Sequence, residues 1–176
     1  MKVYLKLLPL ITTDLHPHLK KIFPVREKVN NAIVLAFNDD FAKYAAVLIQ
    51  SMLKYSSESH YYDIIILNTC ISEENKAGLL SIVENCDNFS IRFITIDIKN
   101  VDKLYIDRGT ANLSPEAYYR LLIGDLLSDE YKRAVYLFEE DGEKKYVYLL
   151  DEDMKIETIG KVSVNLAEKA LAVAVN

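Results

Sequence analysis

The sequence predicts an α/β domain in which helices cover both faces of a mainly parallel sheet. Short apolar runs typical of buried strands occur at Ala32–Phe37, Tyr62–Asn68 and Phe89–Asp97. Segments with apolar residues at helical spacing separate these runs. The resulting order, strand-helix-strand-helix-strand, favours parallel strands joined by right-handed crossovers.

The predicted helices begin with recognisable capping signals. Asp39 or Asp40 can cap a first helix that runs to about Tyr55, and Ser72 can cap the second. The third helix is predicted to begin at Ser114, with a proline in its first position. Its expected apolar face consists of Ala117, Tyr118, Leu121, Leu122 and Leu126.

Arg120, on this third helix, has two interpretations. Glu116 lies one helical turn earlier, so the two side chains could form a surface ion pair. Alternatively, the guanidinium could bind a sugar or phosphate group. The spacing alone leaves both interpretations open.

Two similar apolar runs that end in acidic residues follow the third helix. They are "AVYLFEEDGE", residues 134–143, and "VYLLDEDMKI", residues 147–156. The Asp141-Gly142 pair, which separates the apolar parts of the two runs, predicts a hairpin. Only the second run contains Asp-x-Asp, formed by Asp151 and Asp153. At a strand end both carboxylates could bind one Mg²⁺ or Mn²⁺ ion, although a solvated acidic turn has the same spacing.

The composition narrows the classes of function. A chain of 176 residues suits one domain, and 51% hydrophobic residues can form a sizeable core. The net charge of −5 argues against a nucleic-acid partner, which requires a basic surface. Cys70 and Cys86 are interpreted as buried free thiols, which would fit a reducing compartment.

Residues 1–30 are predicted to form an N-terminal extension, and residues 31–176 the domain itself. The extension is basic and apolar but has no cleavage site of small residues, so we do not expect export. It could contact a membrane surface or another chain of an oligomer, or be a poorly packed arm. We therefore expect a cytoplasmic protein, with the inner face of the membrane as a site for peripheral contact.

Acidic or polar residues follow several of the expected strands. In an open parallel sheet, ligands bind beyond the carboxyl ends of the strands. None of the five glycines forms a phosphate-binding loop, so a bound phosphate would need a metal ion or a basic side chain.

Taken together, these segments resemble the bacterial glycosyltransferases of family eight. The resemblance spans roughly residues 31–137 and is carried by "AIVLAFNDDFAKYAAVLIQSMLKYSS", "YDIIILNTCISEENKAGLLSIV", "NFSIRFITIDI" and "LSPEAYYRLLIGDLL". It implies a Rossmann-like GT-A type fold. It also implies a retaining, UDP-sugar-dependent hexosyltransferase of the kind that builds lipopolysaccharide or other cell-surface glycans.

The resemblance implies a set of nucleotide-sugar-binding residues. The family holds the uridine at the end of the first strand, where this chain has Ala36, Asn38, Asp40 and Phe41. The family usually has an aspartate at Asn38, and an amide accepts a hydrogen bond less strongly than a carboxylate. Phe41 can still stack on a base, as the family's tyrosine does. Arg120 matches an arginine that contacts the donor sugar and diphosphate.

The metal-binding motif departs from the family. At the family's distance after the arginine helix, this chain has Phe138 and Glu140 in place of two aspartates. The Asp-x-Asp motif follows later, at Asp151 and Asp153, where it would hold Mn²⁺ or Mg²⁺ against the diphosphate. Either the hairpin is an insertion ahead of a retained motif, or the motif has moved out of the site.

The later part of the family, which supplies acceptor contacts and a metal-binding histidine, has no match in this sequence. We therefore expect a C-terminally truncated domain, the nucleotide-binding half alone. Two functions follow: a UDP-sugar-dependent transferase domain, or a degenerate, non-catalytic domain that acts as a binding or interaction module. No residue is assigned as catalytic, and the sequence specifies neither the donor sugar nor a glycan, lipid-linked or protein acceptor.

Overall fold

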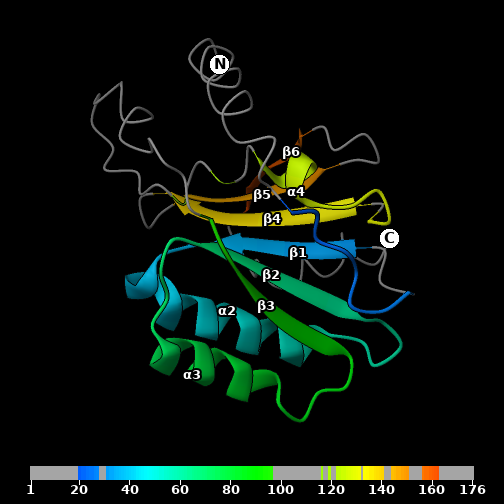
Figure 1. Ribbon diagram of the computed structural model, residues 1–176. Coiled ribbons are helices and arrows are strands. Elements are labelled where there is room, and N and C mark those ends of the chain that lie inside the picture. Colours follow the sequence, from blue (N-terminus) through cyan, green and yellow to red (C-terminus); the bar gives the residue numbers. More distant parts are fainter. Residues whose placement is uncertain are drawn as a thin grey trace, which may run out of the picture.

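The computed structural model describes residues 20–27, 31–96, 116, 119, 122–131, 133–140, 144–150 and 156–162. Within this part of the chain, six strands form one sheet in the order β3-β2-β1-β4-β5-β6 (Figure 1). The strands are β1 (Asn31–Ala36), β2 (Tyr62–Asn68), β3 (Phe89–Thr95), β4 (Arg133–Glu140), β5 (Lys144–Leu150) and β6 (Ile156–Val162).

The first four strands are parallel, and β5 and β6 extend the sheet in antiparallel pairs. The predicted α/β class with a mainly parallel sheet is therefore confirmed. The parallel strands have a common carboxyl edge, where β1, β2 and β3 end, and a common amino edge, where they begin.

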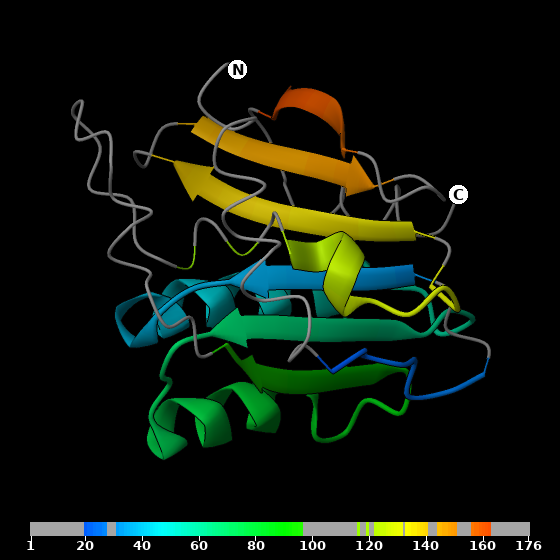
Figure 2. The same ribbon diagram turned by 45° about the horizontal axis from the view of Figure 1, so that its top comes forward.

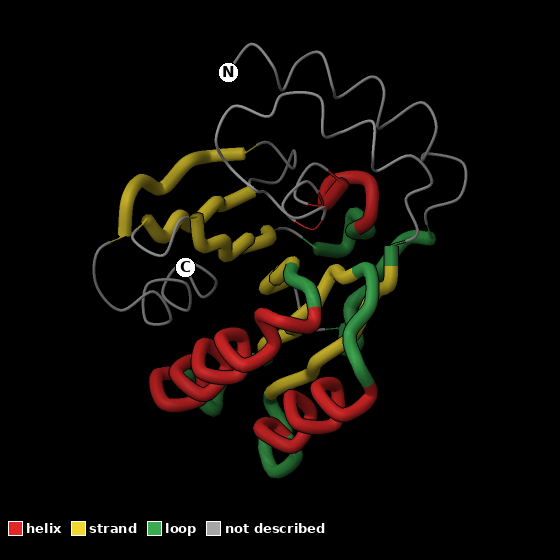
Figure 3. The backbone as a smooth tube through the Cα atoms, turned by 90° about the vertical axis from the view of Figure 1, so that its left-hand side faces the viewer, coloured by secondary structure: helices red, strands yellow, loops and turns green. Residues whose placement is uncertain are grey.

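Helices cover both faces of the sheet, as predicted. The longer helices, α2 (Ala42–Tyr55) and α3 (Glu73–Val83), pack on one face (Figures 1 and 3). A short helix, α4 (Ile123–Leu126), lies on the opposite face over β1 and β4 (Figure 2). We refer to this opposite side of the sheet as the α4 face.

The first predicted helix buries residues at helical spacing. Ala45, Ile49 and Met52 of α2 are buried against the sheet. Phe41, which has the same spacing four positions before Ala45, is half exposed instead. Phe41 lies in a short 3-10 helix, η1 (Asp39–Phe41), just before α2.

Of the two predicted helix caps, the one for α3 is confirmed and the one for α2 is wrong. Ser72 caps α3, because its side chain accepts a hydrogen bond from the Asn75 N–H. Asp39 and Asp40, however, make no capping hydrogen bond to the helix that follows them. Asp39 instead accepts hydrogen bonds from residues at the start of α3. The aspartate therefore connects two elements that are far apart in the sequence.

Side chains along β2 alternate between the two faces, as strand geometry requires. Ile64 and Ile66 belong to the core beneath α2 and α3, whereas Ile65 and Leu67 belong to the core of the α4 face. All of them are buried, which explains why the sequence of β2 is a continuous apolar run.

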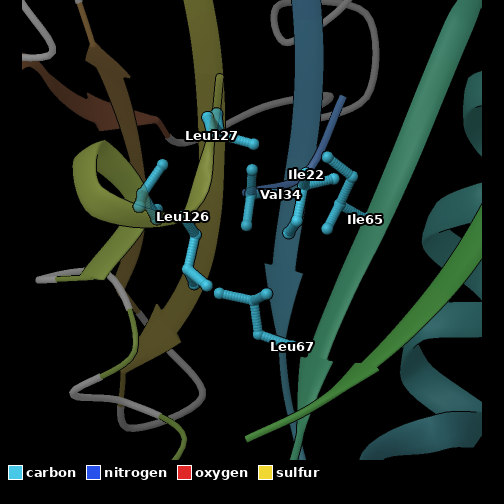
Figure 4. A pocket seen from close by; sticks show the side chains of 7 residues that line it. Ile22, Val34, Ile65, Leu67, Leu126 and Leu127 are labelled. Atoms are coloured by element: carbon cyan, nitrogen blue, oxygen red, sulfur yellow. The ribbon is translucent and has the colours of Figure 1, made fainter. Parts of the chain in front are cut away.

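The core of the α4 face is closely packed. Figure 4 shows apolar side chains converging from the sheet, from the region of α4 and from the N-terminal segment. They are Ile22, Val34, Ile65, Leu67, Ile123, Leu126 and Leu127. The space between them leaves no room for a water molecule, and no polar side chain lines it. This hollow is therefore part of the core rather than a ligand site.

Residues 20–27 pack against the sheet. Ile22 is buried and pairs with Leu127 as a parallel bridge. Its N–H donates to the Leu126 carbonyl at 2.7 Å, and its carbonyl accepts from the Ser128 N–H at 3.0 Å. This part of the predicted N-terminal extension is thus integrated into the α4 face. The division at residue 30 stays a prediction.

The two late apolar runs form the predicted hairpin. β4 and β5 pair antiparallel from Ala134↔Leu150 to Glu140↔Lys144. β4, which contains Phe138 and Glu140, pairs parallel with β1 from Asn31↔Arg133 to Leu35↔Leu137. The first of the two runs therefore occupies the strand beside β1.

The cysteines differ in part from their prediction. Both are free, as expected, but Cys70 is exposed and Cys86 is only half buried. Cys70 lies in the connection after β2 rather than in a packed element. None of the helices in the described part of the chain combines the length and the apolar character that crossing a bilayer requires.

Candidate functional site

Three polar side chains gather at the carboxyl edge of the sheet. Asn38 follows β1, Thr69 follows β2, and Glu116 lies on a segment that packs on the α4 face. We call these three residues the carboxyl-edge cluster. Thr69 and Glu116 are in direct contact, because the Thr69 hydroxyl donates to Oε1 of Glu116.

The positions of Asn38 and Thr69 follow from the strand register. Ala36 pairs with Leu67, and the Phe37 N–H donates to the Leu67 carbonyl at 3.3 Å. The backbone is still extended at Asn38, with φ −94° and ψ 179°. The paired register ends with Ala36 beside Leu67, so Asn38 and Thr69 each lie two residues beyond the paired ends of neighbouring strands.

Alternation places both of these side chains on the same face. Ala36 and Leu67 pack on the core of the α4 face, and residues two positions further along an extended strand point the same way. Asn38 and Thr69 therefore point toward the α4 face. The contact between Thr69 and Glu116 agrees with this orientation.

The segment that carries Glu116 is held against the sheet by aromatic and aliphatic side chains. Tyr119 and Leu122 are buried in the core of the α4 face. The Tyr119 hydroxyl also donates to the Ile96 carbonyl at 3.3 Å. Tyr119 is three residues after Glu116, so these contacts lie close to the carboxylate in the sequence.

The cluster contains buried acceptors that lack hydrogen-bond partners. Within the described part of the chain, Oε2 of Glu116, Oδ1 of Asn38 and Oδ1 of the neighbouring Asn68 are inaccessible to solvent and have no hydrogen-bond partner. Glu116 is only 1% exposed. A buried acceptor without a partner costs roughly 1–3 kcal/mol, and a charged one costs more. Such groups are explained when a ligand supplies the missing donors.

The burial of Glu116 contradicts one interpretation of the sequence. As a surface residue, Glu116 would have formed an exposed ion pair with Arg120, but it is buried and its described partner is Thr69. Nothing in the local pattern indicates this, because Glu116 and Thr69 are 47 positions apart in the chain. Arg120 itself lies outside the described residues.

Asp39 has a structural role at this edge. Its Oδ1 accepts from the Ser72 N–H at 2.8 Å, the Ser72 hydroxyl at 3.0 Å and the Asn75 side-chain amide at 2.8 Å. These hydrogen bonds, that from Asn75 first, lower the pKa of Asp39 below its ordinary value. Asp39 thereby fastens η1 to the N-terminus of α3, where the helix dipole also favours a negative charge.

The other predicted uridine-binding residues lie close to this anchor. Ala36 is the last residue of β1, and Asp40 and Phe41 belong to η1. Asp40 is exposed. Phe41 is 50% exposed, and its ring is tilted by 49° against that of Tyr44 at a centroid distance of 5.8 Å. An aromatic ring with one side uncovered is available for stacking.

The predicted metal ligands, Asp151 and Asp153, lie outside the described residues. The strands on either side of them are described: β5 ends at Leu150, which pairs with Ala134 near the start of β4, and Ile156 of β6 pairs with Leu150. Both strand ends therefore lie at the amino edge, away from Asn38. The metal-binding role of the two aspartates stays a prediction.

The described side chains contain no metal centre. Among them, no three histidine, cysteine, aspartate or glutamate residues are grouped so that they could hold an ion. Across the part of the chain that the structure describes, the carboxyl-edge cluster is thus a site for hydrogen-bond donors, with one buried carboxylate.

Comparison with solved structures supports the fold assignment. The bifunctional glycosyltransferase WbbM matches with a TM-score of 0.52 and 26% identity, covering 66% of this chain and 20% of WbbM. The galactosyltransferase LgtC, solved with donor and acceptor sugar analogues, matches with a TM-score of 0.47 and 22% identity, covering 61% of this chain and 36% of LgtC. A mannosyltransferase from S. cerevisiae, Ktr4p, matches with a TM-score of 0.43 and 17% identity, over 75% of this chain and 41% of Ktr4p.

The match to WbbM, with its TM-score above 0.5, supports the α/β fold of GT-A type glycosyltransferases for this chain. The chain spans less than half the length of each of these three proteins. A search of curated proteins found no match. The model of glycosyl transferase family 8 matches residues 32–138. Because this match covers more than half of the sequence, the chain belongs to glycosyl transferase family 8.

Proposed function

We propose that this chain is the donor-binding part of a retaining hexosyltransferase and that it binds a UDP-sugar at the carboxyl edge of its sheet. One observation carries the proposal: a family 8 domain has buried, unpartnered acceptors at this edge, on Asn38 and Glu116. A nucleotide sugar is rich in hydroxyl and N–H donors, which these acceptors lack. Ligands of open parallel sheets also bind at this edge.

The residues around the cluster have complementary roles in this proposal. Phe41 stacks on the uracil base with its exposed side. Ala36 allows the base or ribose to approach the end of β1, and Asp40 accepts a hydrogen bond from the nucleoside. Arg120 binds the diphosphate or the donor sugar, since a guanidinium pairs well with phosphate oxygens.

A divalent cation is the expected cofactor of this reaction. Mn²⁺ or Mg²⁺ would neutralise charge on the leaving diphosphate. The described residues do not form a site for it. Asp151 and Asp153, its predicted ligands, follow β5, whose last residue lies at the amino edge, opposite to Asn38, so the order of the strands favours a motif that has moved out of the site.

A second candidate function is supported by the order of the strands. The strand parallel to β1 carries Phe138 and Glu140 rather than two aspartates. A domain that has lost its metal motif from this position would bind a nucleotide without transferring the sugar. This favours a degenerate, non-catalytic binding module as the alternative.

Calorimetric titration with UDP, with and without Mn²⁺, separates these functions. The transferase proposal expects UDP binding that strengthens with Mn²⁺, and loss of this strengthening in Asp151→Ala. UDP binding that is insensitive to Mn²⁺ in both proteins would favour the non-catalytic module. No UDP binding under either condition would contradict the transferase proposal.

A further inference from the structure

We propose that Glu116 and Asn38 together bind two adjacent hydroxyl groups of a sugar ring in the donor nucleotide. Oε2 of Glu116 is the stronger of the two acceptors. The inference rests on the proposed function and names the chemical group that the carboxyl-edge cluster recognises.

The carboxylate of Glu116 is prepared for one ligand contact. Burial removes Glu116 from water, and the hydroxyl of Thr69 occupies Oε1. Oε2 is left without a partner. Thr69 therefore fixes the carboxylate plane through one oxygen while the other stays free. An acceptor held in this way loses little conformational freedom when a ligand binds.

Asn38 supplies a second acceptor beside the first. Asn38 and Thr69 each lie two residues beyond Ala36 and Leu67, the last paired residues of β1 and β2, and Thr69 contacts Glu116. Both Asn38 and Thr69 point toward the α4 face, on which Glu116 lies. Oδ1 of Asn38 is also buried without a partner. Two neighbouring positions thus offer free acceptors.

The chemistry of this pair fits a diol better than a nucleobase. The imide edge of uracil presents one N–H between two carbonyl oxygens, and those oxygens would meet a buried carboxylate unfavourably. Two adjacent hydroxyl groups each present a donor. Hydrogen bonds from hydroxyls to a carboxylate are charge-assisted and therefore strong. An acidic side chain binds ribose hydroxyls in this manner at the equivalent edge of dinucleotide-binding sheets.

The test compares Glu116→Gln with a matched control, Glu74→Gln. Glutamine keeps an Oε1 acceptor for Thr69 but replaces Oε2 with an NH₂ donor. Glu74 is exposed in the first turn of α3, so the same change there should leave ligand binding unaltered. The ligands are UDP, 2′-deoxy-UDP, 3′-deoxy-UDP, UDP-glucose and UDP-galactose, titrated by calorimetry.

The expected result is a loss of affinity for UDP of roughly 10- to 100-fold in Glu116→Gln. Both deoxy analogues should bind the wild-type protein more weakly. The analogue that lacks the hydroxyl bound by Glu116 should lose little further affinity in the variant, because that hydroxyl and the carboxylate act as a pair, whereas the other analogue should lose affinity as UDP does. A loss for the UDP-hexoses with no loss for UDP would also support the proposal and would assign the two hydroxyls to the hexose.

Two other outcomes would contradict the proposed role of Glu116 and Asn38 while leaving the proposed UDP-sugar binding intact. If Glu116→Gln binds UDP and the UDP-hexoses as the wild type does, Glu116 does not contact the donor. Equal losses for UDP and both deoxy analogues, with a lowered melting temperature, would assign Glu116 a structural role. By contrast, a wild-type protein that binds none of these nucleotides would overturn the proposed function itself, and this inference with it.

Thermal unfolding of the unliganded proteins provides a second readout. Glu116→Gln should keep or raise the melting temperature, because it removes a buried charge that lacks a full set of partners. A purely structural carboxylate would show the opposite change.

Discussion

Each end of the α4 face contains a buried carboxylate, but the two carboxylates differ in the number of hydrogen bonds that they accept. At the amino end, Asp63 of β2 accepts hydrogen bonds from the Ser90 hydroxyl at 2.9 Å, from Arg92 at 2.6 and 3.2 Å, and from the Tyr131 hydroxyl at 2.5 Å. At the carboxyl end, Glu116 accepts from Thr69 and, among the described residues, from no other side chain. Both carboxylates are almost completely buried.

A single strand connects these two ends. Along β2, Asp63 is followed on the same face by Ile65 and Leu67, which belong to the apolar core of Figure 4, and then by Thr69 just beyond the strand. The same alternation therefore places Asp63 in a network whose hydrogen bonds are complete, and Thr69 beside Glu116, which has a free acceptor. The amino end is thus stabilised by the protein's own groups, whereas the carboxyl end has room for a donor from a ligand.

The completed network also fastens the N-terminal segment. Besides Asp63, Arg92 donates to the Phe23 carbonyl at 2.9 Å and to the Tyr131 hydroxyl at 2.6 Å. Residues near the N-terminus, β2, β3 and the turn before β4 thus meet at one guanidinium. The amino end functions as a structural junction.

The largest effect is expected from removing the acceptor of this junction. Asp63→Ala leaves Arg92 and Tyr131 without their main partner, and breaking a buried pair in this way costs about 3–5 kcal/mol. Urea denaturation measures the loss, with Asp87→Ala, an exposed aspartate after α3, as the matched control. A loss as small as that of the control would show that the amino end is not a structural junction.

A smaller effect is expected from Tyr131→Phe. Burial, followed by the hydrogen bond to Asp63, raises the pKa of Tyr131 well above its ordinary value of 10.0. Its contribution is therefore complete below pH 10 and is lost as the pH rises toward the raised value. The variant should lose about 1 kcal/mol at pH 8 and should decline less steeply than the wild type above pH 10.

Urea unfolding at several pH values between 8 and about 11.5 tests this expectation, under conditions where the protein remains soluble. Tyr61→Phe is the matched control, since Tyr61 is exposed. Parallel stability curves for Tyr131→Phe and the wild type across this range would contradict the assigned role of the hydroxyl.

The smallest effect is expected at Asp39, which is at the carboxyl edge but has a structural role. Because its pKa is lowered in the folded protein, its contribution is present above the ordinary value of about 3.8 and is lost as the pH falls through the lowered value. Asp39→Ala should be less stable than the wild type at pH 7, and the difference should shrink at pH 3 and below. Asp40→Ala, next to it and exposed, is the control.

A difference between Asp39→Ala and the wild type that stays constant from pH 7 to pH 2 would contradict this reasoning. It would attribute the effect to the backbone of η1 rather than to the charge. In that case the charge of Asp39 would not be stabilised by its hydrogen bonds. The carboxyl edge would then differ more clearly from the amino end, where the charge of Asp63 is stabilised.

The sequence determined the elements whose signals are local. A continuous apolar run, such as Tyr62–Asn68, predicts a buried strand, and apolar residues at helical spacing, such as those of α2, predict a helix. The cap at Ser72 and the hairpin across Asp141-Gly142 depend on residues close together in the chain, and both predictions are confirmed. Family membership followed from the same continuous segments.

Only the tertiary structure decided which distant residues meet. Asp39 was predicted as a cap for its own helix but binds Ser72, 33 positions later, and Glu116 lies against Thr69 rather than on the surface. The sequence also left open which late run lies beside β1, and the register gives that position to β4. The physical reason is the same in each case: periodicity encodes which side of an element is buried, but not the neighbour against which it is buried.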